Sequence, residues 1–231
     1  MDGTSLSGNV ATDRVCPTTD TNGCSNTQEF VAISSASGLG EDEDGILGMW
    51  AGNTGSSDET EMLMPNLVAD STISDNIFSF YMTDTDGQSY IDFGAIDSSV
   101  VTNSGDVVYI DSESSEWWKN QVTGFRWGPE HDDDTEYVIT PGDDDITDTG
   151  TSCILGPRRY MKYIRSVILN KFSSDNRLRF SSWKRDYIFD CSLADEMPSF
   201  DLLYGDYWFQ VNPEDYVVNW YVDGSKCSLC L

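Results

Sequence analysis

Short β-type runs, separated by clusters of glycine, aspartate and serine, recur along most of this 231-residue chain. The runs are rich in aromatic and β-branched residues or alternate apolar with polar residues, as half-buried strands do. The predicted strands are residues 30–33, 77–82, 90–93, 107–110, 137–140, 208–211 and 216–222. This pattern favours an all-β fold, arranged as one large domain or as two smaller lobes.

One segment departs from this pattern. Met161, Ile164, Ile168 and Phe172 recur at helical spacing. Pro157 precedes them and suits the first position of a helix, where a missing N–H costs nothing. The sequence therefore predicts one clear helix after Pro157.

A hairpin is predicted within the first half of the chain. The runs at residues 77–82 and 90–93 are separated by Asp86-Gly87. An Asp-Gly pair is a strong signal for a tight turn between two strands.

Charge excludes several classes of partner. The chain has 40 acidic and 13 basic residues and a net charge of -27, which repels phosphate backbones and anionic membrane surfaces. Nine of the basic residues lie in 158–185, where we interpret them as a solvated face of the helical segment. No stretch approaches the ~20 apolar residues of a membrane span, and no signal segment opens the chain. We expect neither nucleic acid nor a membrane as a partner.

No metal site is predicted. His131 is the one histidine and precedes three aspartates, but consecutive residues of a polar loop rarely converge on one ion. Cys227 and Cys230 form a C-x-x-C without a second pair at zinc-finger spacing. The six cysteines instead indicate an oxidising compartment if they pair, and Cys16 and Cys24 bracket a short loop that a disulfide would close.

The stretch DTGTS at residues 148–152 is the candidate for chemistry. It lies between Ile146 and the apolar run 153–155, and a carboxylate in such surroundings needs hydrogen bonds if it is buried. The alternative is an ordinary surface turn, because Asp, Gly, Ser and Thr are common turn residues. Since the one histidine lies in the acidic loop, serine or cysteine nucleophiles lack a base, and carboxylate chemistry remains.

Several segments, taken in order, resemble the pepsin family of aspartic endopeptidases. Residues 2–8 look like its flap hairpin, and residues 44–49 look like the motif that closes the first lobe's active-site loop. The remaining matches are residues 77–82 and 91–97 (inter-lobe strands), 117–118 (an aromatic pair), 148–152 (the second catalytic loop), and Cys191 with 197–200 (a disulfide-bearing strand).

The resemblance implies a bilobal pepsin-like fold that is incomplete at both ends. Residues 1–96 correspond to a partial N-terminal lobe that starts in the flap, and residues 97–231 to a partial C-terminal lobe. The first lobe's DTG or DSG motif does not occur in these residues. We therefore expect this chain to be inactive by itself.

The mechanism that the resemblance implies uses two aspartates, one from each lobe, which share a proton and hold a water. Asp148 corresponds to the second of them. Its supporting loop residues are Thr149, which bonds to the opposite loop, Gly150, which lets substrate approach, and Thr151 and Ser152, which support the carboxylate. The implied substrate-binding residues are Asp2, Gly3, Thr4 and Trp117.

The same resemblance implies a Cys191–Cys227 bridge and places Cys16–Cys24 in the loop after the flap. Cys153 and Cys230 match no family cysteines, so they either pair with each other or leave one thiol free. The implied partners are polypeptide substrates or pepstatin-like inhibitors, with no cofactor, and the chain is expected to be a monomer. The implied location is secreted or lysosomal/vacuolar, and the sequence pI of about 4.1 fits an acidic compartment.

Three functional hypotheses follow. The first is a truncated aspartic endopeptidase. The second is a catalytically dead homologue that binds peptides as a module. The third is an unrelated acidic β-sandwich binding protein in which the DTG is fortuitous.

Overall fold

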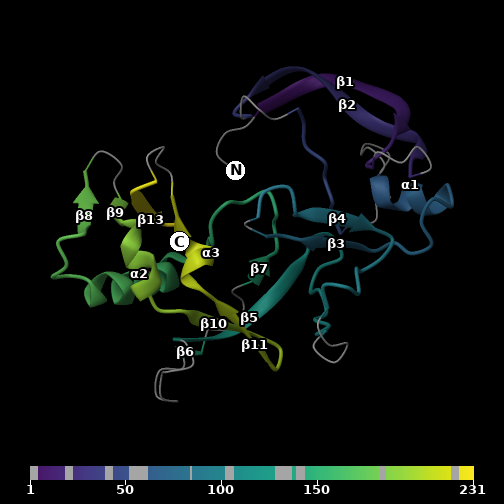
Figure 1. Cartoon of the computed structure of the whole chain (residues 1–231). Coiled ribbons are helices and arrows are strands. Elements are labelled where there is room, and N and C mark those ends of the chain that lie inside the picture. The colour runs from purple at the N-terminus through teal and green to yellow at the C-terminus, as the bar shows by residue number, and fades with distance from the viewer. Residues whose placement is uncertain are drawn as a thin grey trace. The chain divides into compact units, whose positions relative to one another are not determined.

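The chain divides into two compact units, Met1–Val108 and Tyr109–Leu231 (Figure 1). A computed structural model describes residues 5–18, 23–39, 44–51, 62–83, 85–101, 107–127, 137–138, 144–182, 186–219 and 224–231. Strands predominate within these residues, and every strand pair among them is antiparallel. The all-β class is thus confirmed, while the lobe boundary after residue 96 stays a prediction.

The first unit consists of two hairpins and a short helix. Its elements are β1 (Ser5–Val15), β2 (Ser25–Ser37), α1 (Leu63–Ala69), β3 (Phe78–Tyr81) and β4 (Tyr90–Phe93). The Cys16–Cys24 disulfide lies between β1 and β2, which pair with each other. Three residues of α1, Leu63, Met64 and Leu67, form the buried core of this unit.

The hairpin predicted around Asp86-Gly87 is confirmed. β3 pairs with β4 from Phe78 opposite Phe93 to Tyr81 opposite Tyr90. Gly87 has a φ of 73°, a left-handed conformation that glycine adopts without steric cost.

The second unit contains two sheets. In chain order its elements are β5 (Lys119–Trp127), β6 (Tyr137–Val138), β7 (Asp144–Ile146), α2 (Arg158–Lys171), β8 (Leu178–Ser181), β9 (Asp186–Asp190), the 3₁₀ helix η3 (Cys191–Glu196), β10 (Phe200–Tyr204), β11 (Tyr207–Val211), α3 (Pro213–Tyr216), β12 (Val217–Val218) and β13 (Lys226–Leu229). One sheet has the order β11-β10-β5-β6, with β7 also paired to β5, and the other has the order β12-β13-β9-β8.

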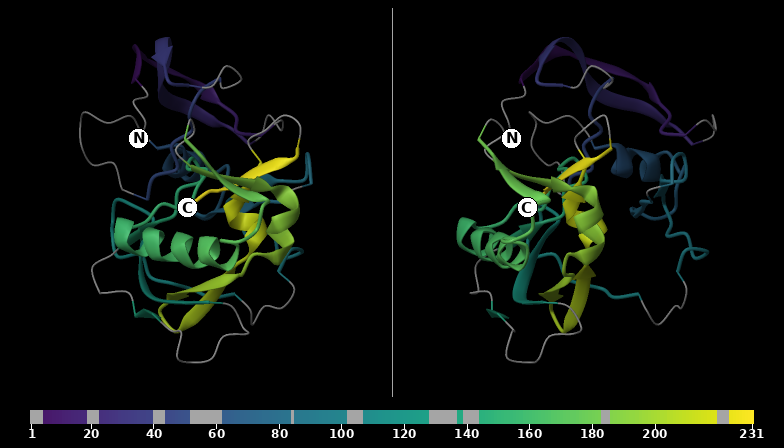
Figure 2. Two further views of the ribbon diagram at one scale, coloured as in Figure 1. Left: turned by 90° about the vertical axis from the view of Figure 1, so that its left-hand side faces the viewer. Right: turned by 60° about the vertical axis from the view of Figure 1, so that its left-hand side comes forward.

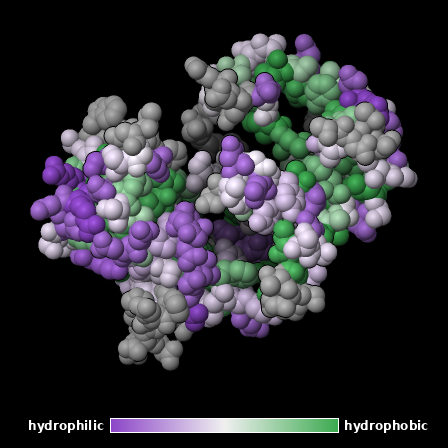
Figure 3. All heavy atoms as spheres, in the orientation of Figure 1, coloured by the Kyte–Doolittle hydropathy of each residue, from purple (hydrophilic) through white to green (hydrophobic). Residues whose placement is uncertain are grey.

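Helix α2 forms where the sequence predicts it and covers the core of the second unit (Figure 2). Ile164 and Ile168 are buried and belong to one cluster with Phe125 of β5 and Phe200 of β10. The opposite face carries basic side chains, and hydrophilic residues gather over α2 and β8 (Figure 3). Pro157 lies one position earlier than predicted, because its ψ of 130° makes it the N-cap residue.

Two local predictions were wrong. Residues 107–110 form no strand, since they pair with no other described strand, and Tyr109 is 85% exposed. Two short helices, α1 and α3, form in addition to the predicted helix after Pro157. Tyr216 ends α3 and does not begin a strand, because the Asn212 and Asp215 capping box starts that helix.

Some predictions fall on residues that the structure does not describe. His131, its three following aspartates, and residues 139–140 and 220–222 lie outside the described ranges. In the parts of the chain that are described, no helix is both long and apolar enough to cross a membrane.

Candidate functional site

The DTG loop follows directly after strand β7 and folds around its own carboxylate. The Thr151 hydroxyl donates a hydrogen bond to Oδ2 of Asp148 at 2.7 Å, and the Gly150 amide donates to Oδ1 at 2.9 Å. The amide of Thr151 also donates to the Asp148 carbonyl at 3.2 Å. An aspartate that accepts from the backbone two residues later is a common turn former. The sequence DTGT thus closes this loop locally.

These two side-chain bonds set the electrostatics of the loop. The Thr151 hydroxyl and then the Gly150 amide lower the pKa of Asp148 below its usual value, while the small degree of burial acts in the opposite direction. Hydrogen bonds donated to a carboxylate favour its charged form. Asp148 is exposed, so it is held by its hydrogen bonds and not by an apolar enclosure.

Gly150 lies where a side chain would crowd the carboxylate. A Cβ at this position would be 3.2 Å from Oδ1 of Asp148, closer than most Cβ contacts. The glycine therefore leaves space for the carboxylate itself, in addition to the access for substrate that the resemblance implies.

Both ends of the loop are anchored within the second unit. On one side Lys119 of β5 pairs with Ile146 of β7, and the Thr147 amide donates to the Trp118 carbonyl at 3.0 Å. On the other side the Ile154 amide donates to the Cys230 carbonyl at 3.0 Å. One end of the loop is thus held by the β5–β7 strand pair, and the other end is held by the C-terminal segment at Cys230.

A disulfide strengthens the second anchor. Cys153 is joined to Cys230, across 77 residues of sequence. The sequence left this pair open, and only the closeness of the two backbone segments decides it. The structure also joins Cys191 to Cys227 and Cys16 to Cys24, which leaves no free cysteine in the described residues.

The structure places Trp118, the neighbour of Trp117, against the start of the Asp148 loop. Trp118 contacts Thr147 through the hydrogen bond described above, and the adjacent Trp117 is 48% exposed. The Trp117 carbonyl accepts a hydrogen bond from the Lys119 amide at 2.7 Å. Ser112 places its hydroxyl 3.1 Å from the same carbonyl, a supporting contact for which the sequence offers no signal.

Of the remaining proposed site residues, the structure describes Thr149 and Ser152. Thr149 and Ser152 are exposed, and among the described residues neither side chain forms a hydrogen bond with Asp148. Asp2, Gly3 and Thr4 lie outside the described residues, just before β1 begins at Ser5. Their roles stay predictions.

Comparison with known proteins identifies the family. The family model described as eukaryotic aspartyl protease matches residues 1–231. The chain is 27% identical to gastricsin of Oryctolagus cuniculus over 179 residues, which cover 76% of this chain and 42% of gastricsin.

Two further relatives agree with that match. Vacuolar protease A of Neurospora crassa is 26% identical over 217 residues, or 93% of this chain and 50% of that protein. Cathepsin E of Mus musculus is 27% identical over 186 residues, or 79% of this chain and 42% of that protein. The chain thus spans half or less of the length of these relatives. With the family model matching from end to end, the chain belongs to the eukaryotic aspartyl protease family.

Proposed function

We propose that this chain contributes one half of the active site of an aspartic endopeptidase, with Asp148 as its catalytic carboxylate. The observation that carries the proposal is the geometry of the DTG loop. Its carboxylate is exposed, has two internal donors, and lies on a loop anchored at both ends. A reacting group has to be held in place in this manner if it is to act on a bound substrate.

Asp148 suits the part of general base. In a pair of carboxylates that share one proton, the ionised member takes a proton from water while the other donates to the peptide carbonyl oxygen. The Thr151 and Gly150 bonds favour the ionised form of Asp148, which is the form that accepts the proton. The proton of such a pair belongs to both groups, so their titrations are coupled.

Peptide hydrolysis by this mechanism requires a second catalytic aspartate. These 231 residues contain one DTG and no DSG motif. We therefore propose that the chain does not hydrolyse peptides by itself. The second candidate function is peptide binding without hydrolysis, which is favoured by the exposed Trp117, because the adjacent Trp118 is hydrogen-bonded to Thr147 at the start of the loop.

Proteolysis by the 231-residue chain tests this proposal directly. We expect no pepstatin-sensitive cleavage of a fluorogenic peptide between about pH 2 and pH 5, where a dyad with pKa values of about 1.5 and about 4.7 shares one proton. Pepstatin-sensitive cleavage that disappears in Asp148→Asn would show that the chain is active alone. Saturable binding of an uncleaved peptide that weakens in Trp117→Ala would favour the binding module.

Complementation tests the role of Asp148. A first lobe of a relative, carrying its own DTG loop, is added in trans to the chain. We expect cleavage with the wild-type chain and with Asp206→Asn, an exposed charge-matched control in the β10–β11 turn, but none with Asp148→Asn. Equal cleavage by both variants would contradict the role of Asp148.

The location proposed for the protein is an oxidising, acidic compartment. Three disulfides support the oxidising condition. One relative is named a vacuolar protease, which supports a vacuolar or lysosomal site, with secretion as the other possibility. The proposed partners are polypeptide substrates and pepstatin-like inhibitors, and the proposed oligomeric state is monomeric.

A further inference from the structure

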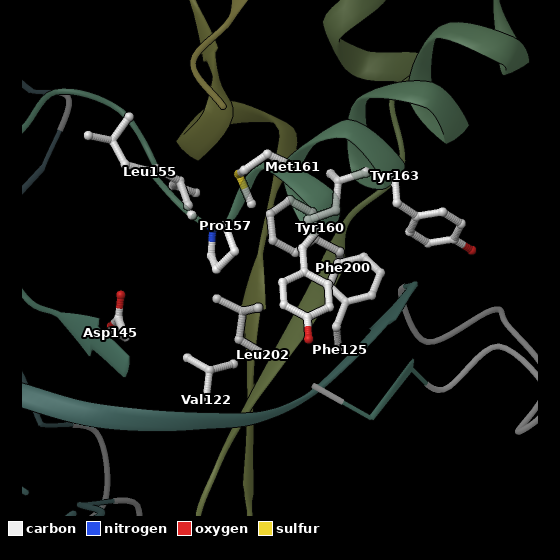
Figure 4. A pocket seen from close by; sticks show the side chains of 13 residues that line it. Val122, Phe125, Asp145, Leu155, Pro157, Tyr160, Met161, Tyr163, Phe200 and Leu202 are labelled. Carbon is white, nitrogen blue, oxygen red and sulfur yellow. The ribbon is translucent and has the colours of Figure 1, made fainter. Parts of the chain in front are cut away.

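An apolar pocket lies in the second unit, between the first turns of α2 and the strands β5 and β10 (Figure 4). Its volume is about 80 Å³, whereas one water needs roughly 10–15 Å³ by the same measure. Aliphatic and aromatic side chains make up most of the lining, including Phe125, Tyr160, Phe200 and Leu202, and Asp145 is the one charged residue among the described residues that line it. The space and its walls suit a compact molecule built on a single ring.

The pocket touches both flanks of the Asp148 loop. Asp145 belongs to β7 and lies three residues before Asp148, whereas Leu155 and Pro157 follow the loop on the way into α2. Figure 4 shows Asp145 on the same side of the pocket as Leu155. A molecule bound here would contact the segments that enter and leave the loop.

The Asp145 carboxylate determines the chemistry of the occupant. Its Oδ2 accepts a hydrogen bond from the Tyr204 hydroxyl at 2.8 Å. This is the one hydrogen bond to the carboxylate within the described part of the chain, so Oδ1 retains the capacity to accept another. A cationic donor would form a charge-assisted bond there, and the net charge of -27 attracts cations toward the protein.

We propose that this pocket binds a small aromatic amine, with the ring among the apolar side chains and the ammonium group on Asp145. Aromatic walls favour a ring and also a nearby cation. By contacting both flanks, the bound amine slows the opening of the Asp148 loop. The inference concerns a site separate from Asp148, and it does not depend on the proposed function.

Binding of benzylamine and its neutral analogue benzyl alcohol tests the site. A ligand of this size is expected to bind the 231-residue chain in the millimolar to sub-millimolar range, with benzylamine the tighter ligand. Asp145→Asn is expected to weaken benzylamine about tenfold, the value of a charge-assisted hydrogen bond, and to leave benzyl alcohol unchanged. Titration calorimetry or ligand-observed NMR measures both affinities.

Asp206→Asn is the matched control, because it removes the same charge from an exposed side chain that does not line the pocket. It is expected to leave both affinities unchanged. Equal weakening of benzylamine by the two variants would overturn the site in favour of diffuse attraction by the acidic protein, and absence of saturable binding would overturn it outright.

Filling the pocket gives a second test. Leu202→Phe places a ring into the space and is expected to abolish binding of both ligands, with folding checked by near-UV circular dichroism. If this variant does not fold, Leu155→Ala replaces it, because Leu155 is 74% exposed and its truncation costs little stability. Leu155→Ala is expected to weaken the binding of both ligands about fivefold through lost apolar contact. Unchanged binding in the folded variant would locate the ligand elsewhere.

Hydrogen exchange tests the effect on the loop. Benzylamine is expected to slow exchange of the Gly150 and Thr151 amides in the wild-type chain but not in the pocket-filling variant. Exchange that is unaffected in the wild type at saturating benzylamine would contradict the coupling to the loop. Neither measurement depends on peptidase activity, so the pocket and the proposed function can fail separately.

Discussion

At the scale of single residues, hydrogen bonds determine the ionisation of the acidic side chains whose pKa is shifted. The carboxyl groups with a lowered pKa are Asp70, Asp97, Asp148, Asp175 and Asp190, and in each the largest cause is a donated hydrogen bond. The direction of the shift therefore does not distinguish Asp148 from structural aspartates. Its place in the DTG loop does.

Removal of the Thr151 hydroxyl tests how the carboxylate is held. Thr151→Ala is expected to raise the pKa of Asp148 toward the ordinary value of about 3.9, because the largest cause of the lowering is lost. NMR titration of the Asp148 carboxyl carbon measures this change. Thr149→Ala is the matched control, since it removes a hydroxyl of the same loop that does not contact the carboxylate, and it is expected to leave the pKa unchanged.

The same bond makes stability depend on pH in a known direction. A folded-state pKa below the unfolded value of about 3.9 stabilises the protein above that pH, and the contribution is lost as the pH falls through the folded pKa. Near pH 6 the wild type is thus expected to have a higher melting temperature than Thr151→Ala. The difference between the two melting temperatures is expected to shrink as the pH falls toward about 2. A difference that grows in acid would contradict this account.

At the scale of elements, the position of the Asp148 loop is fixed more by its contacts with neighbouring segments than by the hydrogen bonds within the loop. Strand β7 has only three residues and is held by its pairing with β5. On the far side the backbone bond of Ile154 and the Cys153 disulfide both lead to Cys230. The position of the carboxylate therefore depends on segments far away in the sequence.

Loss of the Cys153–Cys230 disulfide is expected to destabilise the second unit. The bridge spans 77 residues, and the chain-entropy model assigns a loop of that length about 4.5 kcal/mol. The double variant Cys153→Ala with Cys230→Ala is therefore expected to unfold at lower urea and to exchange the Thr151 and Ile154 amides faster.

The Cys16–Cys24 bridge supplies the comparison for that experiment. It spans 8 residues in the first unit, and the same model assigns it about 2.5 kcal/mol. Its removal is expected to leave exchange at Thr151 unchanged. Loop exchange that responds equally to both double variants would show that the anchor at Cys230 does not hold the loop.

At the scale of the whole molecule, net charge acts against compactness. The chain carries a net charge of -27, and like charges repel more strongly in the folded state, where they are closer together. The basic residues are concentrated in 158–185, so they compensate only part of the surface. Stability should consequently depend on the ionic strength of the solution.

Salt is expected to stabilise the protein at neutral pH. Raising sodium chloride from about 0.01 M to about 0.1 M shortens the Debye length from about 30 Å to about 10 Å and screens the repulsion. The thermal midpoint is expected to rise, and potassium chloride should have the same effect at equal ionic strength. A midpoint that falls with salt would show that attractive ion pairs outweigh the repulsion.

Elements with strong local signals were predictable from the sequence. The β3–β4 hairpin follows from Asp86-Gly87 between two β-rich runs, and α2 follows from four apolar residues at helical spacing. Helix α1 escaped prediction because its seven residues include Pro65 and are too few to establish a period. Residues 107–110 have β-type residues but no partner strand, and an unpaired strand is not stable.

The sequence by itself determined the β class, the family and the position of Asp148 in a DTG loop, because these depend on the types of residues and their order along the chain. Only the tertiary structure decided that Cys153 pairs with Cys230, that Trp118 contacts Thr147, and that Asp145 lines an apolar pocket. Each of these depends on which distant segments the sheets and α2 bring together. Such contacts form between surfaces of the folded chain, and no local pattern of residues specifies them.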